Sequence, residues 1–200
     1  MNRSRRRGQS LVEYAVTVPV FLLILLGMLE FGFAFSQHMT MEYATREGAR
    51  TGAALNNGTT EFLCNGSNDQ NVDNQVIAAV QRVLTGAGSA VKIGQVGDVR
   101  IYKAGANGQE TGPVNVWKPG GGTESVGGVK LLFHRTAFGW NPCGRKADST
   151  GPTDDVDSIG VSISYTYQFV TPLASLMRIA GGGTLPMSDR TVMALNPDPL

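Results

Sequence analysis

The sequence predicts an α+β protein, in which a long N-terminal helix precedes a small head with a mostly antiparallel sheet and one or two helices. Three observations predict this fold. Residues 11–35 form an apolar run of helical length, residues 73–86 place apolar side chains at helical spacing, and residues 161–169 alternate apolar with polar side chains. We therefore expect a short basic segment at 1–8, a helix at 9–55 and a head at 56–200.

The apolar run is long enough to cross a bilayer once. Residues 14–29 carry no charge, and the flanking apolar positions extend the run to about 20–25 residues. Arg3, Arg5, Arg6 and Arg7 precede it, so the positive-inside bias predicts a cytoplasmic N-terminus and a head outside the cytoplasm. A cleaved signal peptide, with a loose site at 34–36, is the main alternative, but its apolar core is usually about 7–15 residues long.

We expect the helix to continue past the apolar run. Residues 36–55 contain helix formers and a Glu42–Arg46 pair at the i,i+4 spacing that stabilises helix surfaces. The Asn-Asn-Gly sequence at 56–58 favours a turn and predicts the end of this helix. Small side chains also recur along the stretch and permit the close approach of a sheet or a second helix: Ala44, Ala49 and Ala53, with glycines between them.

The head contains alternating helix and strand signals. Residues 73–86 predict a helix with one apolar face, and the clearest half-buried strand is 161–169. The remaining predicted elements are short strands at 91–93, 99–102 and 114–117, a strand-like run at 131–133, a glycine-rich loop at 120–128, a short helix at 171–179 and a final strand at 190–195.

Glu13 is a carboxylate just inside the apolar run. An acid there is costly unless it lies at the headgroups or meets a positive partner. If the chain is cut between Gly8 and Gln9, the new amine provides that partner, and Glu13 becomes the fifth residue of the mature chain. The amine and carboxylate of neighbouring, staggered helices would then fix the register between subunits. Pro19 removes one helical hydrogen bond and predicts a kink.

These residues resemble the processing site of type IV prepilins, which has a basic leader, a glycine before the cut and a glutamate five residues after it. Tyr14, directly after Glu13, resembles the Glu-Tyr pair of the Flp/Tad branch. Residues 11–53 resemble the TadE-like family in Glu13, Pro19, Gly27, the Glu-Phe-Gly at 30–32 and the block at 44–50. Residues 161–173 and 188–197 resemble that family's closing strand, helix and strand, but the usual arginine-glutamate ending is replaced by Ala-Leu-Asn at 194–196.

The resemblance implies a pilin-like subunit or minor pilin that supports assembly of the Tad pilus, anchored by a single pass in the bacterial inner membrane. It leaves open whether the protein is incorporated in a surface pilus. Its implied partners are a prepilin peptidase, other pilin-like subunits, the inner-membrane assembly machinery and membrane lipid. A large head argues against a bulk fibre subunit.

The two cysteines, Cys64 and Cys143, are far apart in sequence. Outside the cytoplasm they would form one disulfide bond, and closing so long a loop would stabilise the fold by about 4 kcal/mol. Two free thiols in a core are the alternative, because sequence spacing does not show that the sulfurs meet.

Other classes of function find little support. The net charge of +1 argues against a nucleic-acid partner, and neither His38 nor His134 can be placed in a catalytic arrangement. We expect no enzyme activity, cofactor or metal. Two acid clusters, 69–74 and 154–157, resemble calcium loops weakly, and polar loops explain them more simply.

A permanently anchored protein with an extracytoplasmic binding domain is the alternative function. Such a domain would bind a carbohydrate or a protein partner through aromatic side chains, although aromatics of this kind more often belong to a core. The candidates are Trp117, Trp140, Tyr165 and Tyr167.

Overall fold

The computed structural model describes residues 4–55, 71–147, 156–179 and 182–195. Its contacts divide the chain into two units, and the long helix α1 (Ser4–Leu55) contributes to both. The N-terminal unit contains Met1–Ser36 and Tyr167–Leu185, and the head unit contains Gln37–Thr166 and Pro186–Leu200. The helix is described as far as Leu55, and the turn predicted at 56–58 to end it lies outside the described residues.

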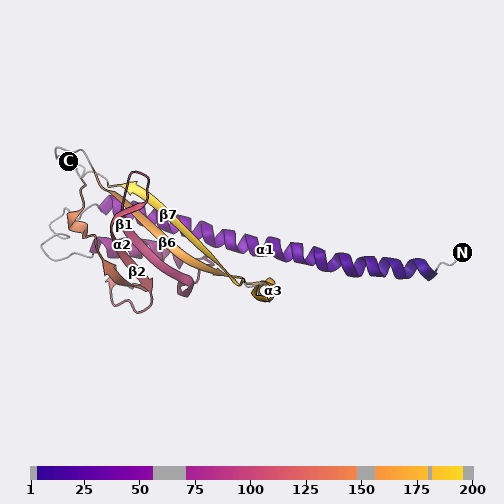
Figure 1. Ribbon diagram of the computed structural model, residues 1–200. Helices are drawn as coiled ribbons and strands as arrows, with labels where there is room; N and C mark the ends of the chain where they lie inside the picture. The colour runs from indigo at the N-terminus through magenta and orange to yellow at the C-terminus, as the bar shows by residue number, and fades with distance from the viewer. Residues whose placement is uncertain (1–3, 56–70, 148–155, 180–181, 196–200) are drawn as a thin grey trace. The chain divides into compact units, whose positions relative to one another are not determined.

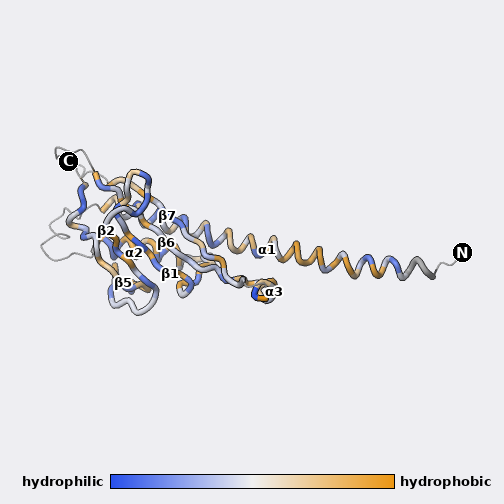
Figure 2. The backbone as a smooth tube through the Cα atoms, viewed as in Figure 1, coloured by the Kyte–Doolittle hydropathy of each residue, from blue (hydrophilic) through white to orange (hydrophobic). Residues whose placement is uncertain are grey.

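The N-terminal unit combines the apolar part of α1 with a returning segment of the chain. This segment includes the end of β6 (Ser158–Gln168), the short helix α3 (Leu173–Ile179) and the start of β7 (Thr184–Ala194). Figure 1 shows α3 at the tip of the strand pair, beyond the ends of β6 and β7, and Figure 2 shows that the apolar residues of α1 form one long stretch. The predicted helix at 171–179 is therefore confirmed, and the final strand begins earlier than predicted.

The head unit is built on a five-stranded sheet with the strand order β5-β2-β1-β6-β7. Antiparallel pairing joins β1 (Val96–Ala104) to β2 (Glu110–Pro119) and to β6, and joins β2 to β5 (Phe133–Phe138). The centre of the sheet aligns Val99 with both Trp117 and Ile163. Three of the predicted strands therefore become neighbours, and the α+β fold with a mostly antiparallel sheet is confirmed.

Two short segments differ from the predictions. Residues 91–93 are not a strand, because Ile93–Gln95 forms a 3-10 helix, η1, directly before β1. The predicted loop at 120–128 contains β3 (Ser125–Val126), which pairs with β4 (Val129–Lys130) across Gly127 and Gly128. Both glycines have positive φ angles, so this two-residue turn depends on their conformational freedom.

The core of the head unit lies between the helices and one face of the sheet. The helix α2 (Asn71–Leu84) buries the apolar face predicted from its spacing, including Val76, Ile77 and Val80. A β-carbon added at Gly48 of α1 would lie 2.7 Å from Val80 Cγ2 and 3.2 Å from a Cγ atom of Val161 in β6. The predicted close approach at small residues is therefore confirmed: α1 contacts both α2 and the sheet where it lacks side chains.

Candidate functional site

The surface of α1 between Leu11 and Phe35 is mostly apolar and exposed. Exposed large side chains occur on all sides of the helix, so the helix has no polar face for water. Among the described residues, one helix, within Gly8–Leu55, is long and apolar enough to cross a membrane. The exposed set comprises Leu11, Val12, Tyr14, Val16, Val20, Phe21, Leu22, Leu23, Ile24, Leu25, Met28, Leu29, Phe31, Phe33 and Phe35.

Glu13 lies on this exposed surface, one helical turn from Gln9. The Gln9 side-chain amide donates a hydrogen bond of 3.3 Å to Glu13 Oε1, so both residues share one face of α1. Thr17 Oγ1 donates to the Glu13 carbonyl at 2.8 Å. The arrangement leaves the carboxylate accessible to a group on a neighbouring helix.

The other predicted site residues of α1 are also accessible. Gly8 has no atom within 4 Å of an added β-carbon, and Tyr14 is 73% exposed. Pro19 lies inside α1, and the helix continues through it. The kink, the cut after Gly8 and the register role of Glu13 stay predictions.

A second carboxylate, Glu30, lies at the other end of the uncharged run and is only 3% exposed. Its Oε1 accepts a hydrogen bond of 2.8 Å from the Val170 backbone N–H, and its Oε2 accepts one of 2.9 Å from Thr171 N–H. The Tyr167 hydroxyl donates to Oε1 as well. Three donors thus stabilise a carboxylate that would otherwise be costly to bury.

Glu30 belongs to the residues that resemble the TadE-like family, but the sequence predicts no partner for it. The available signal was its position, because it ends an uncharged run that Glu13 begins. The donors come from a segment about 140 residues later in the chain, and local patterns do not reveal such pairs.

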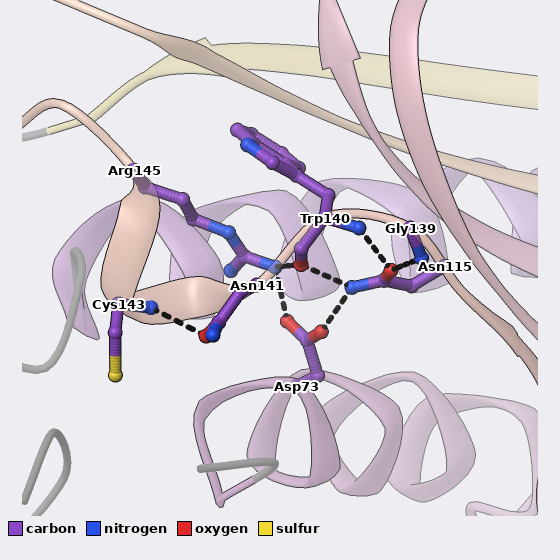
Figure 3. Close-up of polar contacts among 7 residues, drawn as sticks. All are labelled: Asp73, Asn115, Gly139, Trp140, Asn141, Cys143 and Arg145. Atoms are coloured by element: carbon purple, nitrogen blue, oxygen red, sulfur yellow. Dashed lines mark hydrogen bonds and ion pairs between the residues drawn. The ribbon is translucent and has the colours of Figure 1, made fainter. Parts of the chain in front are cut away.

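The head unit contains a buried polar network that joins α2, β2 and the turn after β5 (Figure 3). Asp73 Oδ1 accepts from Arg145 Nη2 at 2.6 Å, and Asp73 Oδ2 accepts from Asn115 Nδ2 at 2.7 Å. Asn115 Oδ1 accepts from the backbone N–H groups of Gly139 and Trp140 at 2.8 and 2.7 Å. The network therefore links three segments that are distant in sequence.

The network is structural in character. Both side chains of the Asp73–Arg145 ion pair are fully buried, and the Arg145 guanidinium lies 4.3 Å from the centroid of the Trp140 ring. Burial raises the pKa of the Asp73 carboxyl, while the Arg145 charge and its hydrogen bond oppose that rise. Asp73, which belonged to the weak calcium pattern, binds Arg145 and Asn115 in the described structure; residues 69–70 of that pattern lie outside the described residues.

Cys143 lies next to this network in the short helix η2 (Pro142–Gly144), where its N–H donates to Asn141 Oδ1 at 3.0 Å. The predicted partner, Cys64, lies outside the described residues, so the disulfide stays a prediction. The second acid cluster is only partly described, and its Asp157 forms an ion pair with Lys103 at 2.6 Å.

The aromatic residues of the alternative binding function are core residues. Trp117, Tyr165 and Tyr167 are at most 2% exposed, and Trp140 is 5% exposed. A cavity of about 610 Å³ does open on the sheet face, but its charged side chains already have polar partners within the protein. Arg100 pairs with Glu110 at 2.7 Å and with Asp98 at 3.6 Å, and Arg190 donates to Gln109 at 2.6 Å.

The fold and the exposed apolar helix define a class, namely single-pass membrane proteins that carry an α+β head. Residues 8–50 match the family model described as TadE-like protein, which confirms the resemblance predicted from the sequence. The match indicates a Tad pilus-associated protein with an N-terminal apolar helix. No curated protein and no solved structure matches the chain.

Proposed function

We propose that the protein is a pilin-like subunit, or minor pilin, that supports assembly of a Tad-type pilus. A prepilin peptidase removes residues 1–8, and the mature helix associates with the helices of other pilin-like subunits. One observation carries the proposal: the family match begins at Gly8 and covers the part of α1 whose apolar surface is exposed and carries Glu13.

The physical basis is the pairing of opposite charges in an apolar setting. Cleavage creates an amine on Gln9, and Glu13 lies one turn away on the same face. An amine from a staggered neighbouring helix lowers the cost of keeping the Glu13 carboxylate in lipid. Two neighbouring helices are then most stable at the axial stagger that pairs the amine of one helix with the Glu13 carboxylate of the other. That stagger sets the register between subunits. The inner-membrane assembly machinery would extract such subunits from the lipid.

Processing is tested by expressing the full chain with and without a prepilin peptidase and reading the N-terminus by mass spectrometry. We expect a mature chain that begins at Gln9 only with the peptidase. Gly8→Val should block the cut without disturbing the fold, because the β-carbon meets no atom within 4 Å. Gly27→Val, also in open space, is the matched control and should be cut normally. An uncut chain, or a cut near Ser36, would favour the anchored or secreted alternatives.

The register role is tested by Glu13→Ala. We expect normal membrane insertion and normal processing, but strongly reduced piliation, measured by electron microscopy and by recovery of sheared pili. Glu42→Ala, which removes an acid from the same helix beyond the apolar run, should leave piliation unchanged. Normal piliation in the Glu13→Ala strain would remove the proposed role.

A further inference from the structure

Glu30 fixes the position of a chain segment relative to the apolar helix. Its two carboxylate oxygens bind the backbone of Val170 and Thr171, directly before α3. All of these residues belong to the N-terminal unit. We call residues 167–179 and 182–185 the α3 tip; its start lies at the level of Glu30 on α1.

The spacing between Glu13 and Glu30 along α1 indicates where Glu30 lies relative to a bilayer. Glu13 and Glu30 are 17 positions apart (30 − 13), which is about 26 Å along a helix at 1.5 Å per residue. A hydrocarbon core is about 30 Å thick, and no charged residue lies between the two acids. Glu30 therefore lies at the boundary of the hydrocarbon when Glu13 lies at the opposite one.

The α3 tip exposes the side chains that suit this boundary. Ile179 is 88% exposed, Val170 63% and Leu185 45%. The sequence from Tyr167 to Leu185 contains no acid and one base, the exposed Arg178. Apolar side chains beside a single cation favour an interface between acyl chains and phosphate headgroups.

The exposed apolar surface continues onto α1 next to Glu30. Phe31 and Phe35 are 72% and 54% exposed, and their rings stack with centroids 6.2 Å apart. Val170 of the α3 tip and Phe31 of α1 therefore both offer exposed apolar side chains beside Glu30, and the same lipid can cover them.

We propose that the α3 tip rests in the lipid–water interface at the C-terminal end of the membrane span, as a second membrane contact. Ile179 and Val170 lie among the acyl chains, and Arg178 binds headgroup phosphate. Glu30 sets the depth of this contact through its bonds to the backbone. The proposal depends on α1 spanning a membrane and is independent of any role in a pilus.

The test uses the full chain in vesicles of phosphatidylcholine and phosphatidylglycerol whose acyl chains carry bromine, which quenches nearby tryptophan. Ile179→Trp should lose fluorescence to a degree comparable with Phe31→Trp on α1. The matched control is Val129→Trp, because Val129 is 60% exposed on β4 of the head unit and should not be quenched. The native Trp117 and Trp140 are buried in the head unit and provide the background.

Two outcomes would overturn the proposal. Quenching of Ile179→Trp no stronger than that of Val129→Trp would place the tip in water. Protection from bromine that appears only at high protein density would show that a second copy, rather than lipid, covers the tip. Adding Glu30→Ala to Ile179→Trp should reduce the quenching, while Phe31→Trp in the same background should stay quenched and so report an intact span.

Discussion

At the scale of single residues, burial decides what an ion pair contributes. Asp73 and Arg145 are fully buried, so water cannot solvate either charge if its partner is removed. Glu42 and Arg46 form an i,i+4 pair on the surface of α1, with side chains 29% and 58% exposed. Because water screens both charges, such a pair contributes little to the stability of the fold, although it is the pair that the sequence predicted.

We expect Asp73→Ala to lower the free energy of unfolding by about 3–5 kcal/mol, because it leaves the Arg145 charge buried without its acid. Glu42→Ala should lower it by less than about 1 kcal/mol. Urea unfolding of the full chain in detergent, followed by tryptophan fluorescence, measures both values. The double variant Asp73→Leu/Arg145→Met should recover most of the loss, and failure to recover would mean that the hydrogen bonds to Asn115 dominate.

At the scale of elements, the two parts of α1 differ in how closely other segments pack against them. Before Ser36 its glycines face open space, as Gly27 and Gly32 show. Within the head unit, Gly48 and Gly52 allow α1 to contact α2 and β6, and an added β-carbon at Gly52 would lie 2.5 Å from Ile159 Cδ1. One helix therefore combines an exposed apolar segment with a closely packed segment.

Gly48→Val tests this difference. The valine overlaps Val80 and Val161, and overpacking a core costs about 1–3 kcal/mol, which exceeds the few tenths gained in helix propensity. We expect a lower midpoint of urea unfolding. Gly27→Val on the same helix should leave that midpoint unchanged, and equal midpoints for the two variants would contradict the packing described.

At the scale of the whole molecule, two buried tyrosines link stability to alkaline pH. Burial raises the pKa of Tyr102 and of Tyr165 above the usual value of about 10. The unfolded chain loses these protons first, so their contribution to stability is complete below pH 10. It is lost as the pH rises from the unfolded pKa toward the folded pKa.

We therefore expect the free energy of unfolding to fall above about pH 10, and we expect Tyr165→Phe to reduce the slope of that fall. Unfolding curves of the full chain in detergent between pH 8 and 11 measure the slope. Tyr43→Phe is the matched control, because Tyr43 is 57% exposed and lies in the head unit beyond the apolar run. An unchanged slope for Tyr165→Phe would show that this tyrosine does not carry the effect.

The sequence by itself determined the elements whose signals are local. A bilayer-length apolar run, a helical spacing at 73–86 and a strict alternation at 161–169 each depend on neighbours along the chain, and the helix and strand types followed from them. The strand-like spacing at 91–93 was wrong because three residues are too few to separate a strand from a 3-10 turn.

Only the tertiary structure decided which distant groups meet. Glu30 binds donors near Val170, and Asp73 binds Arg145, because the path of the chain brings these segments together. The sequence around a carboxylate does not show which donor it will bind. Its partner is the donor that the folded chain brings within hydrogen-bond distance of the buried carboxylate. The sequence therefore revealed the apolar helix and its acids, while the fold decided which of those acids is held and which stays accessible.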